Sequence, residues 1–518
     1  MKLEFLGHAG VMIERGPTRL VMDAWFSDQG AFDGAWYQLP CNHHLGARDW
    51  SGITAAIVSH EHLDHVDGEF LAGLGDKVPI LTPRYPSPRL ARQVYRLARK
   101  PTQALLPGVS HRFGDLELRI WIEESPMNHD SVWVFKAGDR SFVHTVDSRL
   151  TPQQLDEILE FTDGRVDALA VQCAGASWFP LAYASIEPPR KLALSQRKRE
   201  HKLEYARSVA EHLRPAALLL IAGPPAFLDP ELRHANTDPS FPHAGESKAW
   251  LERAGYRGRV LTPLPGDRLD LDSTELDEDR DAHAEFAWDR VPEYIQAYAA
   301  RMAPVIAQIR ARAEALVVDE LDARIVEHFT RMLGHSRYFR ERIDMDVLFD
   351  IENARAGDQG DQAGRWLVRI RPDDYGVERW DGAAPYQYRY RFHLRWLKRI
   401  LVEGLHWEDF LLSLRFSAER DPDVYNDHLL GLLKFDHVLA LEAVEQFERG
   451  ESSETIEVRT EDGTRYEIAK YCPHAGASLE RAPIEGRRIT CLLHHYVFDL
   501  DTGDCLSGNC RLATRRID

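Results

Sequence analysis

Cysteine is scarce in this sequence. Six of its 518 residues are cysteine. Four of these lie within about 50 residues of the end of the sequence: Cys472, Cys491, Cys505 and Cys510. The chain opens with "MKLEFLGHAGVMIERG", which alternates like a β-strand and has no apolar core of the kind found in signal peptides. Few cysteines without such a signal indicate a reducing compartment. We therefore expect a cytoplasmic protein whose clustered cysteines include metal ligands.

Two further absences narrow the function. No run of apolar residues is long enough to span a bilayer, so we expect no membrane partner. Basic residues are not in excess either, because 64 Lys and Arg stand against 82 Asp and Glu, for a net charge of −18. This charge disfavours non-specific binding to nucleic acid or to an anionic membrane. An anionic small-molecule substrate would need a local basic pocket.

The length of the chain exceeds what one hydrophobic core normally holds, so we expect several domains. Residues 1–270 interleave apolar runs with helical patterns, which predicts a layered α/β architecture. The acidic run "DLDSTELDEDRDAHAE" (270–285) marks the first boundary, and residues 271–446 form a predicted α+β domain. "FERGESSE" (447–454) marks the second boundary, and residues 447–518 have the strand-and-turn pattern of a small all-β domain.

The periodicity of apolar residues predicts the individual elements. We expect strands over 55–60, 132–138, 141–146, 166–172, 217–223, 346–352, 365–372, 386–394 and, as a pair, within 455–470. We expect helices over 198–214, within 291–335, and over 394–405.

The first metal motif, "SHEHLDH", directly follows a predicted buried strand. It supplies His60, His62, Asp64 and His65 within six residues. Side chains at alternate positions can serve two neighbouring metal positions, with the first two ligands directed one way and the last two the other. Imidazole and carboxylate donors together suit zinc, iron or manganese. A histidine-rich surface turn is the plainer alternative, but four such donors at a strand end favour a metal site.

This motif is the signature of the metallo-β-lactamase superfamily, which residues 1–270 resemble. The resemblance implies an αββα fold, a further histidine ligand and a carboxylate that bridges two metals. "PMNHDSVWVF" offers His129 for the histidine, and "SFVHTVDSRL" offers Asp147 for the bridge. The alternatives are a hydrogen-bonded turn histidine for His129 and a structural carboxylate for Asp147.

The superfamily usually places a final histidine ligand after its last core strand. Here that strand, "ALLLIAGPPAF", has none, and His234 and His243 follow further along. We take His243 as the candidate. His8 in "GHAGV" and Asp23 in "VMDAWF" match a lactonase-like branch in which this histidine borders the metal pocket. His8 is therefore a candidate catalytic residue, with a satisfied buried histidine as the alternative.

The second metal motif pairs Cys-x-His with Cys-x-x-His. Its residues are Cys472, His474, Cys491 and His494, and they could hold a tetrahedral zinc. The surrounding "CPHAGASL", "EG" and "VFDLDTGDCLSG" resemble Rieske ferredoxin domains. This resemblance implies a [2Fe–2S] cluster in which two thiolates bind one iron and two imidazoles bind the other. Cys505 and Cys510 fall outside the ligand pattern and are expected to be free thiols.

The two motifs together favour iron at the first site, because a hydrolytic zinc site has no use for an electron donor. Iron held by histidine and carboxylate can activate dioxygen. Segments of residues 1–435 also resemble the CMP-N-acetylneuraminate hydroxylase family, which hydroxylates an N-acetyl group. These segments include "GAFDGAWYQLP", "HTVDSRL", "LLLIAGPPAFLDPELRHANTDP" and "LVEGLHWEDFLLSLRFSAERDPDVYNDHL". That family carries its Rieske domain at the N-terminus, whereas this chain has it at the C-terminus.

The resemblance implies a monooxygenase that receives electrons from NAD(P)H through a reductase and a ferredoxin or cytochrome b5-type donor. The electrons would pass through the Rieske cluster to one or two non-haem irons, where oxygen is activated and inserted into a small molecule. A homo-oligomer is compatible with this interpretation. Three alternatives remain open: a zinc-dependent hydrolase of a lactone or phosphodiester, a reductase of oxygen or nitric oxide, and a non-catalytic redox sensor.

Overall fold

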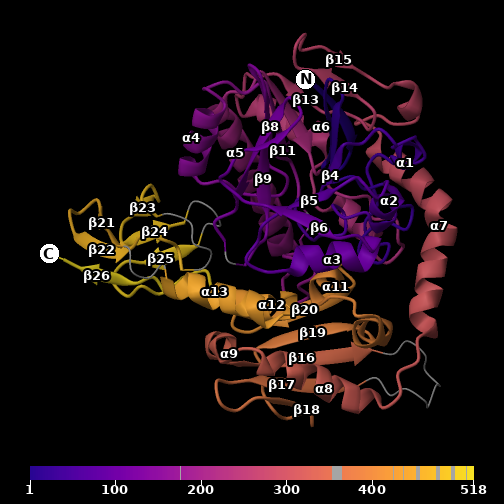
Figure 1. Cartoon of the computed structure of the whole chain (residues 1–518). Helices are drawn as coiled ribbons and strands as arrows, with labels where there is room; N and C mark the ends of the chain where they lie inside the picture. Colours follow the sequence, from indigo (N-terminus) through magenta and orange to yellow (C-terminus); the bar gives the residue numbers. More distant parts are fainter. Residues whose placement is uncertain are drawn as a thin grey trace. The chain divides into compact units, whose positions relative to one another are not determined.

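The computed structural model of the chain contains two compact units. It describes residues 1–125, 127–175, 177–352, 364–423, 425–435, 437–450, 455–473, 479–491, 496–508 and 510–517. The first unit comprises residues 1–123, 130–315 and 409–415, and the second comprises residues 124–129, 316–408 and 416–518. Each unit is described separately below (Figure 1).

Two β-sheets form the centre of the first unit (Figure 1). Within the described residues, the first sheet has the order β15-β14-β1-β2-β3-β4-β5-β6 and the second has the order β13-β12-β11-β10-β9-β8-β7. The strands of the first sheet are β1 (Lys2–Gly7), β2 (Gly10–Arg15), β3 (Thr18–Met22), β4 (Ala55–Ile57), β5 (Ile80–Pro83), β6 (Thr102–Leu105), β14 (Arg268–Asp270) and β15 (Leu276–Asp277). Those of the second are β7 (His111–Phe113), β8 (Leu116–Ile122), β9 (Ser131–Ala137), β10 (Arg140–His144), β11 (Ala168–Gln172), β12 (Ala217–Ile221) and β13 (Val260–Leu261).

The two sheets pack face to face through an apolar core, and helices cover their outer faces. Side chains of α1 (His43–Gly46), α2 (Gly68–Gly73) and α3 (Arg89–Ala98) pack on the first sheet. Those of α4 (Pro152–Phe161), α5 (Pro188–Leu213) and α6 (Ala244–Arg253) pack on the second. This is the predicted αββα sandwich. The strands predicted before the two metal-ligand loops are confirmed as β4 and β10.

The acidic run at 270–285 contributes to the first sheet. β14 and β15 form a hairpin, and β14 pairs antiparallel with β1. Part of this run is therefore the edge of the sheet, and most of its other residues are exposed to solvent. α7 (Val291–Ala315) also belongs to the first unit, because Tyr298, Met302 and Ile306 pack with Tyr37 in one apolar cluster. The structure divides the chain into two units, whereas the sequence predicts three domains. The boundaries of those three domains remain predictions.

Residues 409–415 return to the first unit from a later part of the sequence. They contain the end of α11 (Trp407–Leu412). Arg415 Nη2 lies 2.9 Å from Asp229 Oδ2, and both side chains are buried. Trp36 Nε1 donates a hydrogen bond to the Leu412 carbonyl at 2.9 Å. A buried ion pair and an indole hydrogen bond therefore hold this short segment in the first unit.

The second unit contains a mixed sheet and several helices. Within the described residues, its strand order is β18-β17-β16-β19-β20. The strands are β16 (Met345–Glu352), β17 (Arg365–Ile370), β18 (Gly376–Arg379), β19 (Tyr388–His393) and β20 (Phe416–Arg420). The helices are α8 (Leu321–Gly334), α9 (Arg337–Ile343), α10 (Leu394–Lys398), a π-helical turn η3 (Arg399–Glu403), α12 (Asp427–Lys434) and α13 (Val438–Gly450). No helix in the described part of the chain has the length and apolarity needed to cross a membrane.

The C-terminal part of the second unit is all-β and has its own core, as predicted. Its described strands form two small sheets, in the orders β21-β22-β26 and β23-β24-β25. The strands are β21 (Thr455–Arg459), β22 (Arg465–Ala469), β23 (Ile484–Glu485), β24 (Arg488–Thr490), β25 (Val497–Asp499) and β26 (Thr514–Arg516). Tyr466, Ile468, Phe498 and Leu500 are almost completely buried between them.

Candidate metal centres

The loop after β4 contains the first motif, and hydrogen bonds stabilise its conformation. The hydroxyls of Tyr85 and Ser131 donate to the Ser59 carbonyl at 2.7 and 3.2 Å. The Asp67 carboxylate accepts from the amides of Phe26 and Ser27, both at 2.8 Å, and caps α2. Backbone hydrogen bonds to buried side chains thus fix both ends of the loop that presents the histidines.

One group of possible metal ligands consists of His60, His62 and Asp147. Their ligand atoms all lie within 4.8 Å of one another. His60 Nε2 lies 2.9 Å from His62 Nδ1, so the two ring nitrogens face the same point. Asp147 reaches this point from the turn that follows β10, on the second sheet. The loop of one sheet and a turn of the other therefore build this position together.

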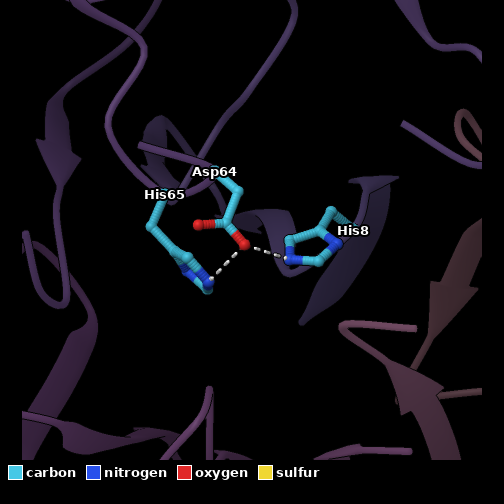
Figure 2. A group of neighbouring side chains, drawn as sticks. All are labelled: His8, Asp64 and His65. Atoms are coloured by element: carbon cyan, nitrogen blue, oxygen red, sulfur yellow. Dashed lines mark ion pairs between the residues drawn. The ribbon is translucent and has the colours of Figure 1, made fainter. Parts of the chain in front are cut away.

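A second group consists of His8, Asp64 and His65 (Figure 2), whose ligand atoms also lie within 4.8 Å of one another. Asp64 Oδ2 lies 2.9 Å from His8 Nε2 and 3.7 Å from His65 Nε2. All three side chains are buried, with exposed fractions of 7%, 4% and 0%. Asp64 and His65 thus group with His8, whereas His60 and His62 group with Asp147. Ligand atoms of His60 and His65 also lie within 4.8 Å of Asp23, so the two groups adjoin each other.

Asp147 lies next to both groups. Its Oδ1 is 3.7 Å from His65 Nε2, while the carboxylate also belongs to the His60 group. Within the described residues, Asp64 Oδ1, His65 Nε2 and Asp147 Oδ1 are buried and have no hydrogen-bond partner. Buried acceptors without partners are costly unless a cation satisfies them. The donor set of imidazoles and carboxylates therefore fits one or two iron, zinc or manganese ions.

Asp23, at the end of β3, orients two of these residues. Its Oδ2 lies 2.9 Å from His65 Nδ1, and its Oδ1 accepts from the Ser59 amide at 2.8 Å. The Ser59 hydroxyl in turn lies 2.9 Å from His60 Nδ1. A carboxylate that holds the proton on Nδ1 leaves the Nε2 lone pair of His65 available for a metal.

The charges of this site favour a cation. Burial opposes ionisation of Asp64, but His65 and His8 outweigh it and lower the pKa of this carboxyl well below its usual range. Burial also disfavours the charged form of His65, yet Asp64, Asp147 and Asp23 raise its pKa to about 10. Three carboxylates therefore converge on the ring nitrogens, and the same field would stabilise a bound metal cation.

Three residues that border the site have left-handed backbone conformations. The φ angles are 52° at His8, 47° at Asp23 and 51° at Val146, which precedes Asp147. Each follows the end of a strand of the sandwich. Side chains other than glycine rarely adopt this conformation, and where it occurs it often serves to direct functional groups. Here it turns the chain so that His8, Asp23 and Asp147 reach the site.

Two predicted ligands are placed differently. His243 caps α6, with its Nδ1 accepting from the Glu246 amide, and its ring stacks on Trp288 at 5.4 Å. It belongs to none of the possible ligand groups in the described part of the chain. His129 lies in the segment assigned to the second unit, where its ring is 5.6 Å from that of Phe435. Its role as a ligand stays a prediction.

Sequence reasoning missed Asp130. Its Oδ1 lies 3.7 Å from His60 Nε2, and its side chain is 14% exposed. The signal was available, because Asp130 directly follows the histidine in "PMNHDSVWVF". A carboxylate beside a predicted ligand, at the start of a buried strand, merits consideration in its own right.

The second centre is described in part. Cys472, which follows β22, and Cys491, which follows β24, are 1% and 0% exposed and lie in one apolar cluster. The Cys491 amide donates to the Tyr496 carbonyl at 2.8 Å. The predicted partners His474 and His494 lie outside the described residues. The two thiols thus follow strands of the two small sheets of this β domain.

Comparisons with known families match both parts of the chain. Residues 18–220 match the beta-lactamase superfamily domain. Residues 437–516 match the Rieske [2Fe-2S] domain, so a [2Fe–2S] cluster is the cofactor of this region. The chain therefore joins a metallo-β-lactamase fold to a C-terminal Rieske domain.

Two curated relatives share this whole length. Proteins of Mycobacterium tuberculosis (strain CDC 1551 / Oshkosh) and Mycolicibacterium smegmatis, both described as Rieske 2Fe-2S iron-sulfur proteins, are each 28% identical. Each match covers 98% of both chains.

Solved structures resemble only part of the chain. A possible metal-dependent hydrolase from Veillonella parvula (13% identity, TM-score 0.37) covers 52% of this chain and 98% of its own. CmlA, a diiron beta-hydroxylase from Streptomyces venezuelae (18% identity, TM-score 0.36), covers 54% of each. At TM-scores of this size the similarities bear on neither activity nor substrate.

Proposed function

We propose that this protein is a Rieske-fed non-haem iron monooxygenase. One or two irons would be held by the ligands of the metallo-β-lactamase fold, and electrons would come from the C-terminal [2Fe–2S] domain. The observation that carries the proposal is the pair of adjacent ligand groups around Asp147, with three unpartnered buried ligand atoms, in a chain that also matches the Rieske domain. A hydrolytic centre would have no need of the second domain.

The proposed ligands divide into two positions. His60, His62 and Asp147 would form the first, with His129 as a further ligand that the sequence resemblance suggests. His8, Asp64 and His65 would form the second, with Asp147 between them. His8 would then take the place of the final superfamily histidine, a role for which the geometry of His243 gives no support.

Bound iron would supply the binding and activation of dioxygen, and the Rieske cluster would supply single electrons. The reaction consumes a substrate C–H bond, one dioxygen, two electrons and two protons, and yields a hydroxylated substrate and one water. The chain's own contribution is to orient the ligands. Asp23 holds the proton of His65 on Nδ1, and Ser59 orients the His60 ring.

The electrons would start from NAD(P)H and reach the cluster through a reductase and a ferredoxin or cytochrome b5-type donor. The sequence resemblance suggests the N-acyl group of a nucleotide sugar, or a related metabolite, as the substrate. Lys202 on α5 supports an anionic substrate. Burial and Arg149 lower its pKa to about 8, while Asp147 and Asp130 act in the opposite direction, so a cationic side chain lies within electrostatic reach of the site.

Metal analysis of anaerobically purified protein tests the first part. Protein made with ample iron is expected to hold about three or four irons per chain, two of them in the cluster, whose reduced form gives a Rieske electron paramagnetic resonance signal. Protein with two irons and one zinc, active on lactones or phosphodiesters without reductant, would instead be the hydrolase.

A single turnover tests the second part. Chemically reduced protein is mixed with ¹⁸O₂ and CMP-N-acetylneuraminate as the first probe, followed by other N-acylated nucleotide sugars. Incorporation of ¹⁸O into a product, together with reoxidation of the cluster, supports the proposal. Oxygen consumption that is equal with and without every organic probe identifies an oxygen reductase. A cluster that stays reduced in the presence of oxygen and probe contradicts the electron route.

A further inference from the structure

Cys505 and Cys510 face each other in a short antiparallel ladder. Asp504 and Arg511 form an antiparallel bridge, and the Cys505 amide donates to the Cys510 carbonyl at 3.3 Å. The two cysteines are therefore the next facing pair of this short ladder. Facing residues of a hydrogen-bonded antiparallel pair have Cα atoms about 5.5 Å apart and side chains on the same face. Disulfides form across Cα separations of roughly 4.4–6.8 Å.

The chemistry of the pair is that of a nucleophile and its partner. Both are free, half-buried thiols. The neighbouring Cys510 side chain lowers the pKa of Cys505 to about 6, against the effect of burial. Cys505 is thus the thiolate-forming member, and Cys510 the thiol that can resolve an oxidised sulfur.

This ladder also packs against the cluster-binding core. Both cysteines contact the apolar cluster that contains Cys472 and Cys491. Gly508, between them, lies so close to Tyr496 that an added Cβ would be 2.3 Å from its ring. The Tyr496 carbonyl accepts the amide hydrogen bond of Cys491. A change at these cysteines or at Gly508 can therefore reach a predicted cluster ligand through direct packing.

We propose that Cys505 and Cys510 are a modification site, a dithiol that closes to an intramolecular disulfide when a hydroperoxide oxidises it. In the first step Cys505 sulfur attacks one oxygen of hydrogen peroxide, the O–O bond breaks, and a sulfenic acid and water form. In the second, Cys510 sulfur attacks the sulfenic sulfur, the S–S bond forms, and a second water leaves. Two thiols lose two electrons and two protons in all. The site is independent of the proposed oxygenase function.

Mass spectrometry of the intact holoprotein tests this. The protein is treated with hydrogen peroxide while the [2Fe–2S] absorption is monitored, then alkylated and cut by an Asp-specific protease. Cleavage before Asp504 separates Cys505 and Cys510 from Cys491. The expected result is a peptide that lacks both alkyl groups and two hydrogens, and that regains both thiols after dithiothreitol. Cys41, which has no cysteine opposite it among the described residues, stays alkylated and is the internal control.

Two further measurements decide the outcome. In Cys505→Ser protein, Cys510 should remain alkylated, and in wild-type protein disulfide formation should shift the midpoint potential of the cluster reversibly. The proposal is overturned if both cysteines stay alkylated while the cluster is intact. It is equally overturned if the disulfide forms only after the [2Fe–2S] absorption has been lost. The wild-type measurement stands even if the variant fails to fold.

Discussion

The two candidate metal centres of this chain differ in their ligand types and in the side chains that surround the ligands. At the first, every candidate ligand is an imidazole or a carboxylate, and buried polar groups such as Asp23 and Ser59 hold the ligands in place. At the second, the predicted ligands Cys472 and Cys491 lie in an apolar cluster among strands. A site of hard donors needs a hydrogen-bonded support, whereas thiolates that bind iron covalently can be held by packing.

This difference predicts which substitutions should weaken metal binding at each centre. The support of the first centre consists of charges and hydrogen bonds, so small electrostatic changes should alter metal affinity in a graded manner. The support of the second is an apolar core, so removal of a ligand should abolish the cluster outright. Four variants test this contrast, from the largest expected effect to the smallest.

Cys491→Ala should abolish the Rieske cluster. It removes one of the two thiolates that are predicted to bind the same iron. Acid-labile sulfide and the electron paramagnetic resonance signal are expected to vanish, while the metal of the first centre stays. Cys173→Ala is the matched control, since Cys173 is equally buried but lies in the first unit. Retention of the cluster in Cys491→Ala would refute the ligand assignment.

Acidification should destabilise the first unit through His144. This side chain is 1% exposed, and burial lowers its pKa from 6.5 to about 4. Its neutral form donates from Nε2 to the Ala9 carbonyl and accepts the Val146 amide at Nδ1. Because the unfolded chain binds the proton more readily, this stability is complete above pH 6.5 and is lost as pH falls toward 4, by about 3 kcal/mol.

The measurement compares wild type with His144→Gln by differential scanning calorimetry at several pH values between 4 and 7.5. The variant is expected to be less stable at neutral pH but to lose less stability on acidification. Parallel pH dependences for the two proteins would show that another group is responsible.

Asp23→Asn should weaken metal binding at the first centre by about 10–100-fold. An amide that donates to His65 Nδ1 would favour the tautomer whose proton sits on Nε2, the ligand atom. Titration with Fe²⁺ or Zn²⁺ under anaerobic conditions measures the affinity. Asp67→Asn is the matched control, because this buried carboxylate at the end of the same loop accepts from the backbone amides of Phe26, Ser27 and Phe70 and contacts no candidate ligand among the described residues. Equal losses in both variants would assign the effect to loop stability.

Tyr85→Phe should have the smallest effect. The Tyr85 hydroxyl donates to the Ser59 carbonyl, which also accepts from Ser131. Its loss should cost about 1 kcal/mol in the free energy of unfolding and leave the metal affinity of the first centre within about twofold. A larger fall in affinity would mean that the position of the Ser59 backbone limits the geometry of the site.

The sequence predicted the parts that are local. Periodicity located the strands that precede the two ligand loops. The spacing in "SHEHLDH" predicted two directions, and the structure groups His60 and His62 with Asp147 but also His60 and His65 with Asp23. The strand before Asp147 was also predicted, so its place at the end of β10 followed. These predictions are possible because side chains alternate between the two faces of a strand. The direction of a side chain at a strand end therefore depends on only a few neighbouring residues.

The remainder depends on contacts distant in sequence. His8 comes from β1, yet it completes a group with Asp64 because β1 and β4 share a sheet. His243 was the expected final ligand, but as the N-cap of α6 its ring is already used for local hydrogen bonding and stacking. The periodicity of the sequence does not indicate whether His234 or His243 lies near the metal site, because their positions depend on tertiary packing.

Because residues 409–415 belong to the first unit, the chain leaves that unit and returns to it after residue 315. A gene cut after position 315 would encode all the predicted metal ligands of the first motif, and Arg310. It would lack Arg415, the second guanidinium that pairs with the buried Asp229 of the same unit. Recombination at a single point could not exchange one unit for another without breaking that pair. The metallo-β-lactamase fold and the distant segment that belongs to its unit are therefore inherited together.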